Sequence, residues 1–241
     1  MKRKALEKDF DAPDVRALTF DFRSVWSDEA WAEYGEPADV HGDIAARLDA
    51  EDPGTVLDIG CGTGLLRQAL RAGWVGIDRS VEQLRQTPGR TAIAEALRLP
   101  FADDSFGAAA TLYTLYFFED PSLVAAEARR VLKPGGVFAT CAPSRYDSPE
   151  VSHLGERDDF DAFASEDIEE LLTEAFEDVE ITEWNSPFLE LKDAQAAGDY
   201  LQFFYYPHMS RSEADEHAKS LVLPLKITKI GAWGVGRKPR S

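Results

Sequence analysis

A glycine-rich turn around residue 60 is the feature of this 241-residue sequence that points most directly to a bound ligand. The segment Val56-Leu-Asp-Ile-Gly-Cys-Gly-Thr-Gly64 ends a short apolar run and leads into a helical pattern. Glycines at such a strand-to-helix turn let the backbone approach a ligand closely, and the helix N-terminus attracts negative groups. A dinucleotide-binding turn has the spacing Gly-x-Gly-x-x-Gly. Here the third glycine comes one residue early, and Leu65 occupies the dinucleotide position.

Asp58, two residues before Gly60, narrows the class of ligand. A carboxylate in this place would repel a pyrophosphate at close range, whereas it would attract an ammonium or sulfonium cation. The turn therefore favours a cationic ligand over a dinucleotide, although a tight structural turn without any ligand has the same glycines.

A second carboxylate, Asp78, ends the next apolar run and follows Gly60 by 18 residues. A carboxylate in this place accepts hydrogen bonds from both hydroxyls of a ribose. The alternative role is a helix N-cap, which Ser80 makes less necessary. One loop further along, Glu95 and Ala96 would lie beside the adenine of a nucleoside held by the first two loops.

Short apolar runs alternate with helical patterns from residue 55 onward, and signals for helix starts and stops separate them. Ser80, Pro121 and Ser165 stand at helix starts, and the stretch Pro134-Gly-Gly136 ends a helix. This alternation predicts a mostly parallel sheet covered by helices on both faces. The expected strands are Thr55–Ile59, Trp74–Ile77, Thr91–Ala94, Ala108–Leu112, Val137–Cys141, Val179–Trp184 and Leu225–Val235.

A single domain, residues 1–241, accounts for the whole pattern, because no linker is long enough to divide the chain. Within it we expect an N-terminal helical cap (1–50), a cofactor-binding core (51–186), a cap insertion (187–224), and a last strand with its tail (225–241). The two caps interrupt the alternation of strands and helices. We therefore expect them over the carboxyl edge of the sheet, where ligands bind in open α/β folds.

Acidic residues outnumber basic ones by 44 to 26, and the net charge is −18. Asp147 to Glu183 alone holds 15 acidic residues and one basic residue, Arg157, for a net charge of −14. This cluster is a solvated face, a partner surface or part of an adaptation to high salt, although salt adaptation would tend to spread acidic residues over the whole surface, and the sequence leaves these alternatives open. In each case the charge repels nucleic acid and anionic membranes, so neither is an expected partner.

Composition excludes several further classes of protein. Two cysteines, Cys61 and Cys141, are too few for a disulfide framework or a four-cysteine zinc site, and no metal is expected. No window reaches the ~18 unbroken apolar residues of a membrane span, and the basic N-terminus lacks the apolar run of a secretory signal. We expect a cytoplasmic protein, and its oligomeric state stays open.

Four motifs in this order resemble those of a class I S-adenosylmethionine-dependent methyltransferase of the small-molecule, ubiquinone-biosynthesis-like branch. Asp58-x-Gly-x-Gly-x-Gly64 is similar to the first motif of that family, and Asp78 to its ribose-binding acid. Leu99-Pro-Phe-x-Asp-x-Ser-Phe106 is similar to its third-loop signature, and Arg130-Val-Leu-Lys-Pro-Gly-Gly136 to the turn before its fifth strand. The resemblance is close over residues 50–142. It implies a Rossmann-like, seven-stranded sheet whose last strand, Leu225–Val235, is antiparallel.

The resemblance also implies S-adenosylmethionine as the cofactor. The residues implied to bind it are Asp58, Gly60, Cys61, Gly62, Gly64, Asp78, Arg79, Glu95, Ala96 and Leu112. The residues from 58 to 62 would line the methionine part, Gly64 would open the helix beneath, and Leu112 would face the sulfonium. Asp78 would hold the ribose, with Arg79 and Glu95 near the adenine. Gly107 and Glu95 depart from the aspartates usual at their places, which affects fine affinity and not the class.

Aromatic residues gather where an acceptor would bind, and they suit a flat or moderately apolar small molecule. Core packing is the other explanation, and we favour it for Phe117, Phe118 and Phe203. The residues expected in the acceptor pocket are Trp31, Tyr34, Tyr116, Tyr205, Tyr206 and His208. A general base is needed only when the acceptor must lose a proton. Its candidates are His153, Tyr113 and Tyr146.

The favoured function is in-line methyl transfer to a small-molecule acceptor, with the acceptor atom left open. A protein or nucleic-acid methyltransferase is the first alternative. Both the charge and the sequence Thr111-Leu-Tyr-Thr114, which stands in place of an Asn/Asp-Pro-Pro-Tyr/Phe signature, disfavour it. A non-catalytic S-adenosylmethionine-binding protein is the second, and only turnover would exclude it.

Overall fold

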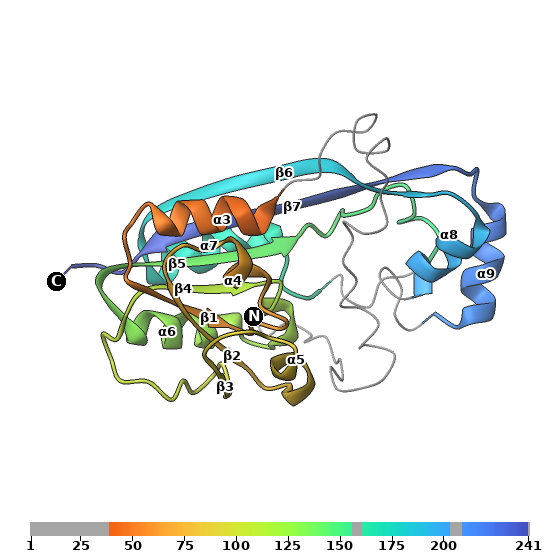
Figure 1. The fold of residues 1–241 in the computed structure, drawn as a ribbon. Helices are drawn as coiled ribbons and strands as arrows, with labels where there is room; N and C mark the ends of the chain where they lie inside the picture. Colours follow the sequence, from red (N-terminus) through yellow and green to blue (C-terminus); the bar gives the residue numbers. More distant parts are fainter. Residues whose placement is uncertain (1–38, 156–160, 203–208, 241) are drawn as a thin grey trace.

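A seven-stranded sheet organises the computed structural model, which describes residues 39–155, 161–202 and 209–240 (Figure 1). The strand order is β3-β2-β1-β4-β5-β7-β6. Strands β1 to β5 pair in parallel, and β7 is antiparallel to both of its neighbours, β5 and β6. The strands are β1 (Thr55–Ile59), β2 (Gly73–Asp78), β3 (Thr91–Ile93), β4 (Phe106–Leu112), β5 (Leu132–Pro143), β6 (Glu177–Leu191) and β7 (Leu225–Arg237). The predicted mostly parallel sheet with an antiparallel last strand is confirmed.

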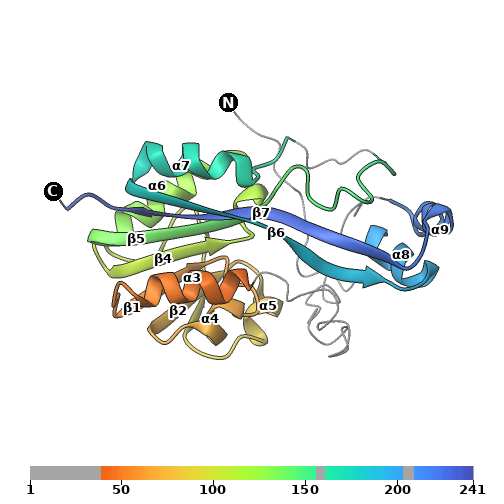
Figure 2. The same cartoon turned by 90° about the horizontal axis from the view of Figure 1, so that it is seen from above.

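Helices cover both faces of the sheet, as Figure 2 shows. One face carries α3 (Val40–Asp49), α4 (Leu65–Ala69) and α5 (Val81–Arg85), and the other carries α6 (Pro121–Val131) and α7 (Ile168–Ala175). Because both faces are buried, β1 is apolar at consecutive positions and does not alternate with polar residues.

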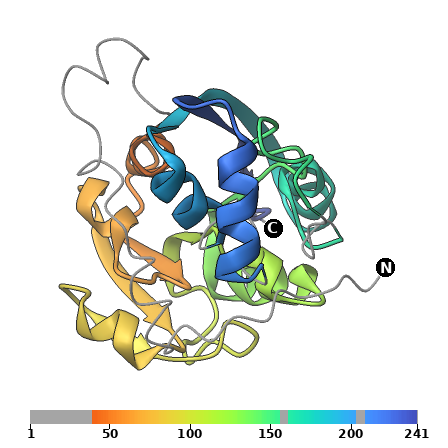
Figure 3. The ribbon, with the colours of Figure 1, turned by 90° about the vertical axis from the view of Figure 1, so that its right-hand side faces the viewer.

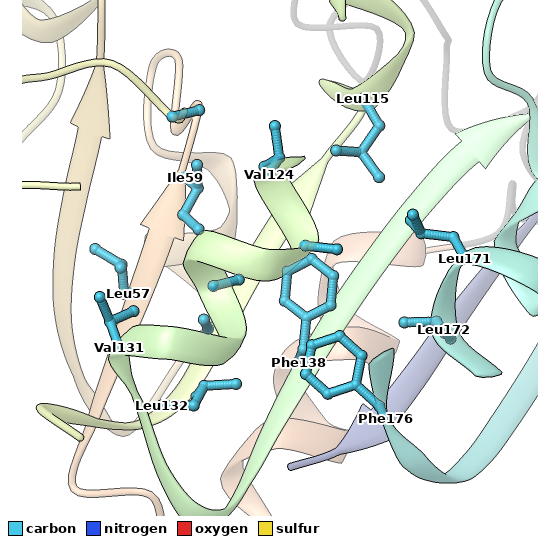
Figure 4. Packing of buried hydrophobic residues seen from close by; sticks show 14 of the residues in the cluster. Leu57, Ile59, Leu115, Val124, Val131, Leu132, Phe138, Leu171, Leu172 and Phe176 are labelled. Carbon is cyan, nitrogen blue, oxygen red and sulfur yellow. The ribbon is translucent and has the colours of Figure 1, made fainter. Parts of the chain in front are cut away.

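Each face of the sheet has its own apolar core. Leu57 and Ile59 of β1 pack with α6 and α7, while Val56 of the same strand packs with α3 and α4. On the first of these faces, Phe138 of β5 stacks on Phe176 with ring centroids 5.2 Å apart (Figure 4). The strands whose carboxyl ends carry the predicted ligand motifs are therefore packed against a separate apolar core on each face.

Helix starts follow the predicted signals in two of three cases. Ser80 caps α5 by accepting a hydrogen bond from the Gln83 amide at 3.2 Å, and Pro121 opens α6. The prediction for Ser165 is wrong, because residues 165–167 form a single 3-10 turn before α7. Asp167 stabilises this turn instead, since its carboxylate accepts from the Ala164 amide at 2.9 Å.

Strands β6 and β7 are longer than predicted and form a two-stranded extension beyond the end of β5. β5 ends at Pro143, paired with Gly231, whereas β6 and β7 stay paired as far as Leu191 and Leu225. Residues 187–191 thus belong to a strand, which corrects the predicted start of the cap insertion. The extension carries α8 (Ala194–Tyr200) and α9 (Arg211–Ser220), and Figure 3 shows both helices in front of the carboxyl edge of the sheet.

Candidate functional site

The glycine loop between β1 and α4 is fixed by hydrogen bonds to β2 and has space next to Gly62. Gly60, Gly62 and Gly64 have φ angles of 74°, 51° and 80°, in the region that favours glycine. The amides of Gly60 and Cys61 both donate to the carbonyl of Ile77, at 2.8 and 3.0 Å. A Cβ on Gly60 would lie 2.6 Å from Thr114 Cγ2, whereas, among the described residues, one on Gly62 would approach only Gln83 Oε1, at 3.8 Å. The side chains around the loop therefore leave room for a ligand at Gly62.

Asp78 joins the glycine loop to the end of β2. Its Oδ2 accepts from the Gly62 amide at 2.9 Å, and its Oδ1 accepts from the Ser80 amide at 2.9 Å. Ser80 is the N-cap of α5, so the alternative capping role does not belong to Asp78. Each carboxylate oxygen has acceptor capacity for a second hydrogen bond, which two ribose hydroxyls could use.

Asp58 is buried in β1 with 3% of its surface exposed. Its Oδ2 accepts a hydrogen bond from Trp74 Nε1 of β2 at 3.1 Å. Burial raises the pKa of this carboxyl to about 7, the Trp74 hydrogen bond opposes the rise, and the charge of Asp78 adds to it. Sequence reasoning missed Trp74, because a tryptophan in an apolar run is typical of core packing.

The third loop lies against the second, as the order of motifs predicts. The Ala94 amide donates to the Asp78 carbonyl at 3.1 Å, which brings the residues after β3 to the end of β2. Glu95 is exposed and Ala96 is buried. Arg130 of α6 fixes the following turn by donating to the carbonyls of Leu99 and Phe101, at 3.0 and 2.8 Å. The two sequence motifs at 99–106 and 130–136 therefore touch.

Tyr113, directly after the buried end of β4 at Leu112, has a φ of 52°, which is strained for a tyrosine. Its ring lies between His41 of α3 and Trp184 of β6, with centroid distances of 5.7 and 6.4 Å. Burial raises the pKa of the Tyr113 phenol well above its usual range, so this group stays protonated at neutral pH. Tyr116 contacts Phe117 at a ring distance of 4.5 Å.

The other candidate bases are exposed in the segment after β5. His153 is solvent-exposed, and Tyr146 has 64% of its surface exposed. Arg79, beside Asp78, is exposed too. The predicted acceptor residues Trp31, Tyr34, Tyr205, Tyr206 and His208 lie outside the described residues, and their roles stay predictions.

Gly107 has a packing reason for its departure from the usual aspartate. A Cβ at this position would overlap the backbone carbonyl of Pro53, which precedes β1. Only glycine allows β4 and the turn before β1 to approach this closely.

Comparisons with known proteins identify the same core. Residues 57–140 match the family model described as "Methyltransferase domain". The chain is 33% identical over 148 residues to the ubiquinone/menaquinone biosynthesis C-methyltransferase UbiE of Desulfotalea psychrophila, covering 56% of each chain. It is 29% identical over 137 residues to the trans-aconitate 2-methyltransferase of Azoarcus sp., covering 52% of this chain and 53% of that one.

The chain is thus similar, over residues 57–140, to methyltransferase domains. Its fold is similar to that of the YcgJ protein of Bacillus subtilis, which superimposes with a TM-score of 0.59 at 19% identity, over 83% of this chain and 98% of that one. The chain spans about half the length of the curated relatives it matches.

The cofactor of this methyltransferase domain is S-adenosylmethionine, and the residues at the carboxyl edge fit it. Gly62 has space above it for a ligand, Asp78 has spare acceptor capacity, and Asp58 offers a carboxylate to a cation. Among the described residues no Lys, Arg or His side chain forms an ion pair with Asp58. Within the same residues, no three His, Cys, Asp or Glu side chains are grouped to hold a metal ion, and no helix is long and apolar enough to cross a bilayer.

Proposed function

We propose that this protein transfers a methyl group from S-adenosylmethionine to a small-molecule acceptor. The observation that carries the proposal is the buried carboxylate of Asp58 beside the open glycine loop. A buried carboxylate without a basic partner is costly unless a cation joins it. S-adenosylmethionine brings two cationic groups, an ammonium and a sulfonium, and Asp78 lies 2.9 Å from the same loop to take the ribose.

The bound donor supplies an activated methyl group, which the acceptor's nucleophilic atom takes in line as the carbon–sulfur bond breaks. The residues of this chain then need to bind the donor and the acceptor, orient them toward each other and exclude water. They need not supply redox or Lewis-acid chemistry. Asp58 and Asp78 hold the two ends of the donor. The strained Tyr113, with its protonated hydroxyl, lies next to Leu112 and serves to position the acceptor.

The aromatic group of His41, Tyr113 and Trp184 supports an acceptor with a flat or apolar part. These rings come from α3, the end of β4, and β6, and they meet at the carboxyl edge. The names of the curated relatives, which include a quinone-pathway C-methyltransferase and a trans-aconitate methyltransferase, also favour a small molecule. The net charge of −18 disfavours nucleic acid as the acceptor.

Calorimetric titration with S-adenosylmethionine and with NAD tests the cofactor assignment. We expect binding of S-adenosylmethionine and none of NAD, because Asp58 would face a pyrophosphate at close range. Tight NAD binding without S-adenosylmethionine binding would refute the proposal. Turnover assays that follow S-adenosylhomocysteine, with candidate acids, phenols and quinols as acceptors, then separate an enzyme from a non-catalytic binding protein.

Hydrogen exchange with S-adenosylhomocysteine plus an acceptor tests the two caps. Covers of this kind become protected when they close over a ligand. We expect protection in Trp26–Tyr34 and in Tyr200–Met209 as well as in the glycine loop. Protection confined to the glycine loop would mean that the acceptor enters from another side.

A further inference from the structure

Trp74 lies beneath the glycine loop in a space that two glycines leave for it. Trp74 and Asp58 share one face of the sheet, because Asp58 pairs with Gly76 and Val56 pairs with Trp74. A Cβ on Gly76 would overlap the far edge of the Trp74 ring and would lie 2.7 Å from Cys61 Sγ. A Cβ on Gly89 would lie 3.2 Å from the opposite side of the same ring. The indole is thus fixed between β2, the glycine loop and the turn before β3.

This fixed position makes the hydrogen bond from Trp74 to Asp58 specific. Trp74 is 6% exposed, and its Nε1 lies 3.1 Å from Asp58 Oδ2. A buried indole N–H usually has a hydrogen-bond partner, and here the partner is the carboxylate. Within the described chain the Asp58 side chain makes no other hydrogen bond, which leaves its Oδ1 to a ligand.

Asp78 is the charged group among the described neighbours of Asp58 that disfavours its ionised form, and the other titratable groups that face it are neutral. Asp78, from the end of β2, is a second carboxylate, and Cys61 and Cys141 are thiols whose pKa values burial raises, which keeps them neutral. The indole N–H is the one group among the described neighbours that favours the anion. It does so as a neutral donor, so it leaves the full negative charge for a cation.

We propose that Trp74 is a positioning residue for S-adenosylmethionine: its indole N–H orients the Asp58 carboxylate and keeps it ionised to receive the cationic end of the cofactor. The inference rests on the proposed cofactor and goes beyond it, because it assigns a role to a residue outside the glycine motif. It also implies that cofactor binding releases a proton below neutral pH, since only the ionised carboxylate attracts the cation.

Replacing the donor while keeping an aromatic ring, Trp74→Phe, should raise the pH at which Asp58 ionises. A hydrogen bond to a charged group corresponds to a shift of about one pH unit or more. For a shift of one unit from about 7, the ionised fraction at pH 6, 7 and 9 falls about tenfold, about fivefold and less than twofold. The affinity for S-adenosylmethionine should fall by the same factors. The titration of the cofactor itself cancels, because it is common to both proteins.

A measurement on the free protein gives a readout independent of binding. The indole N–H resonance of Trp74 should shift with pH as Asp58 titrates, with a midpoint near 7. Trp74→Phe assigns that resonance by its loss, and the ¹³C resonance of the Asp58 carboxyl then reports the higher midpoint. Asp58→Asn should abolish the pH dependence of the indole resonance, which keeps the test valid even if Trp74→Phe folds poorly.

Trp233→Phe is the matched control, because Trp233 is 9% exposed in the same core cluster and its indole makes no hydrogen bond within the described residues. It should leave the pH profile of binding unchanged. If Trp74→Phe weakens binding equally from pH 6 to 9, or leaves the Asp58 midpoint in place, Trp74 only packs and the inference is overturned while the cofactor assignment stands. If the unmodified protein binds no S-adenosylmethionine at any pH, the proposed function itself fails.

Discussion

The parallel strands β1 to β5 and the extension of β6 and β7 reach the same edge of the molecule with different means of stabilisation. The parallel part has two apolar cores, one on each face, and glycine turns that present backbone to a ligand. The extension has a smaller apolar cluster around α8 and α9, and polar side chains tie it to the segment after β5. The parallel part and the extension therefore depend on separate sets of stabilising interactions.

An ion pair with a buried carboxylate is the centre of the polar connection in the extension. Lys229 Nζ of β7 lies 2.6 Å from Asp147 Oδ2, whose side chain is 4% exposed. Asp147 Oδ1 also accepts from the Ile230 amide at 2.9 Å. Next to it, the hydroxyls of Ser148 and Tyr200 lie 2.7 Å apart, and this contact connects α8 to the same segment. Lys229 thus fixes β7 at a point beyond the end of its pairing with β5.

The largest effect is expected from Lys229→Met, which leaves the Asp147 carboxylate buried without its cation. Breaking such a pair on one side should lower the free energy of unfolding by about 3 kcal/mol. Urea unfolding measures this, and the double variant with Asp147→Asn should recover part of the loss. The affinity for S-adenosylmethionine should stay within about twofold. A large loss of cofactor affinity together with an intact fold would show that the two regions are not separate.

Gly60→Ala tests the same separation from the parallel part of the sheet. Alanine at a φ of 74° is strained, and its Cβ would lie 2.6 Å from Thr114 Cγ2. The loop must shift, so we expect affinity for S-adenosylmethionine to fall on the order of 100-fold by calorimetry. Gly54→Ala is the control, since its φ is 71° and no atom of the described residues lies within 4 Å of the added Cβ. If both variants lost the same affinity for S-adenosylmethionine, backbone strain alone would explain the effect of Gly60→Ala.

Asp78→Ala removes the proposed ribose acceptor and should weaken S-adenosylmethionine binding by roughly ten- to a hundredfold, the scale of hydrogen bonds to a charged group. Asp193→Ala makes the contrast. Asp193 caps α8 by accepting from the Ala196 amide at 2.9 Å, so its loss should cost about 1 kcal/mol of stability and no cofactor affinity. An unchanged dissociation constant for Asp78→Ala would show that Asp78 only braces the loop.

The smallest effect is expected at the opposite end of β7, where Glu51 accepts from Arg237 at 2.8 and 3.0 Å and from Arg47 at 2.7 Å. The hydrogen bond from Arg237 is the main reason that the pKa of Glu51 falls to about 2. Because the folded pKa is depressed, this stabilisation is present above the unfolded pKa of about 4.3 and is lost as the pH falls through about 2.

Glu51→Gln should therefore cost about 1 kcal/mol at pH 7 and almost nothing near pH 2. Urea unfolding of both proteins across this range measures the difference, and 1 M salt should reduce it at pH 7. The Arg237–Glu51 pair, whose side chains are 22% and 23% exposed, and the pair at Lys229, whose Asp147 side chain is 4% exposed, would then differ in size and in salt dependence. A loss at Glu51 that equals the loss at Lys229 would contradict that distinction.

In the acidic segment 147–183, the charge pattern alone did not predict which carboxylates are solvated and which form ion pairs. Many of its carboxylates are exposed, as a solvated face requires, among them Glu169, Glu170 and Glu183. Others hold the structure together: Asp147 pairs with Lys229, and Asp167 pairs with Arg145. The sequence could not separate the two groups, because the partners of Asp147 and Asp167 lie 82 and 22 residues away along the chain.

What the sequence determined by itself is the local part of the structure. The apolar runs specified the strands, and Ser80 and Pro121 specified helix starts. The spacing from Asp58 to Gly64 and on to Asp78 predicts a site for a nucleoside that carries a cation. Each of these signals acts within one strand, one turn or one cap, where neighbouring residues suffice to decide the conformation. The tertiary structure decided the rest. It extended β6 and β7 past the end of β5, because the two strands pair with each other there. It placed Trp74 against Asp58, since residues on the same face of adjacent strands meet only after the sheet forms, and it set a pKa near 7 that depends on burial.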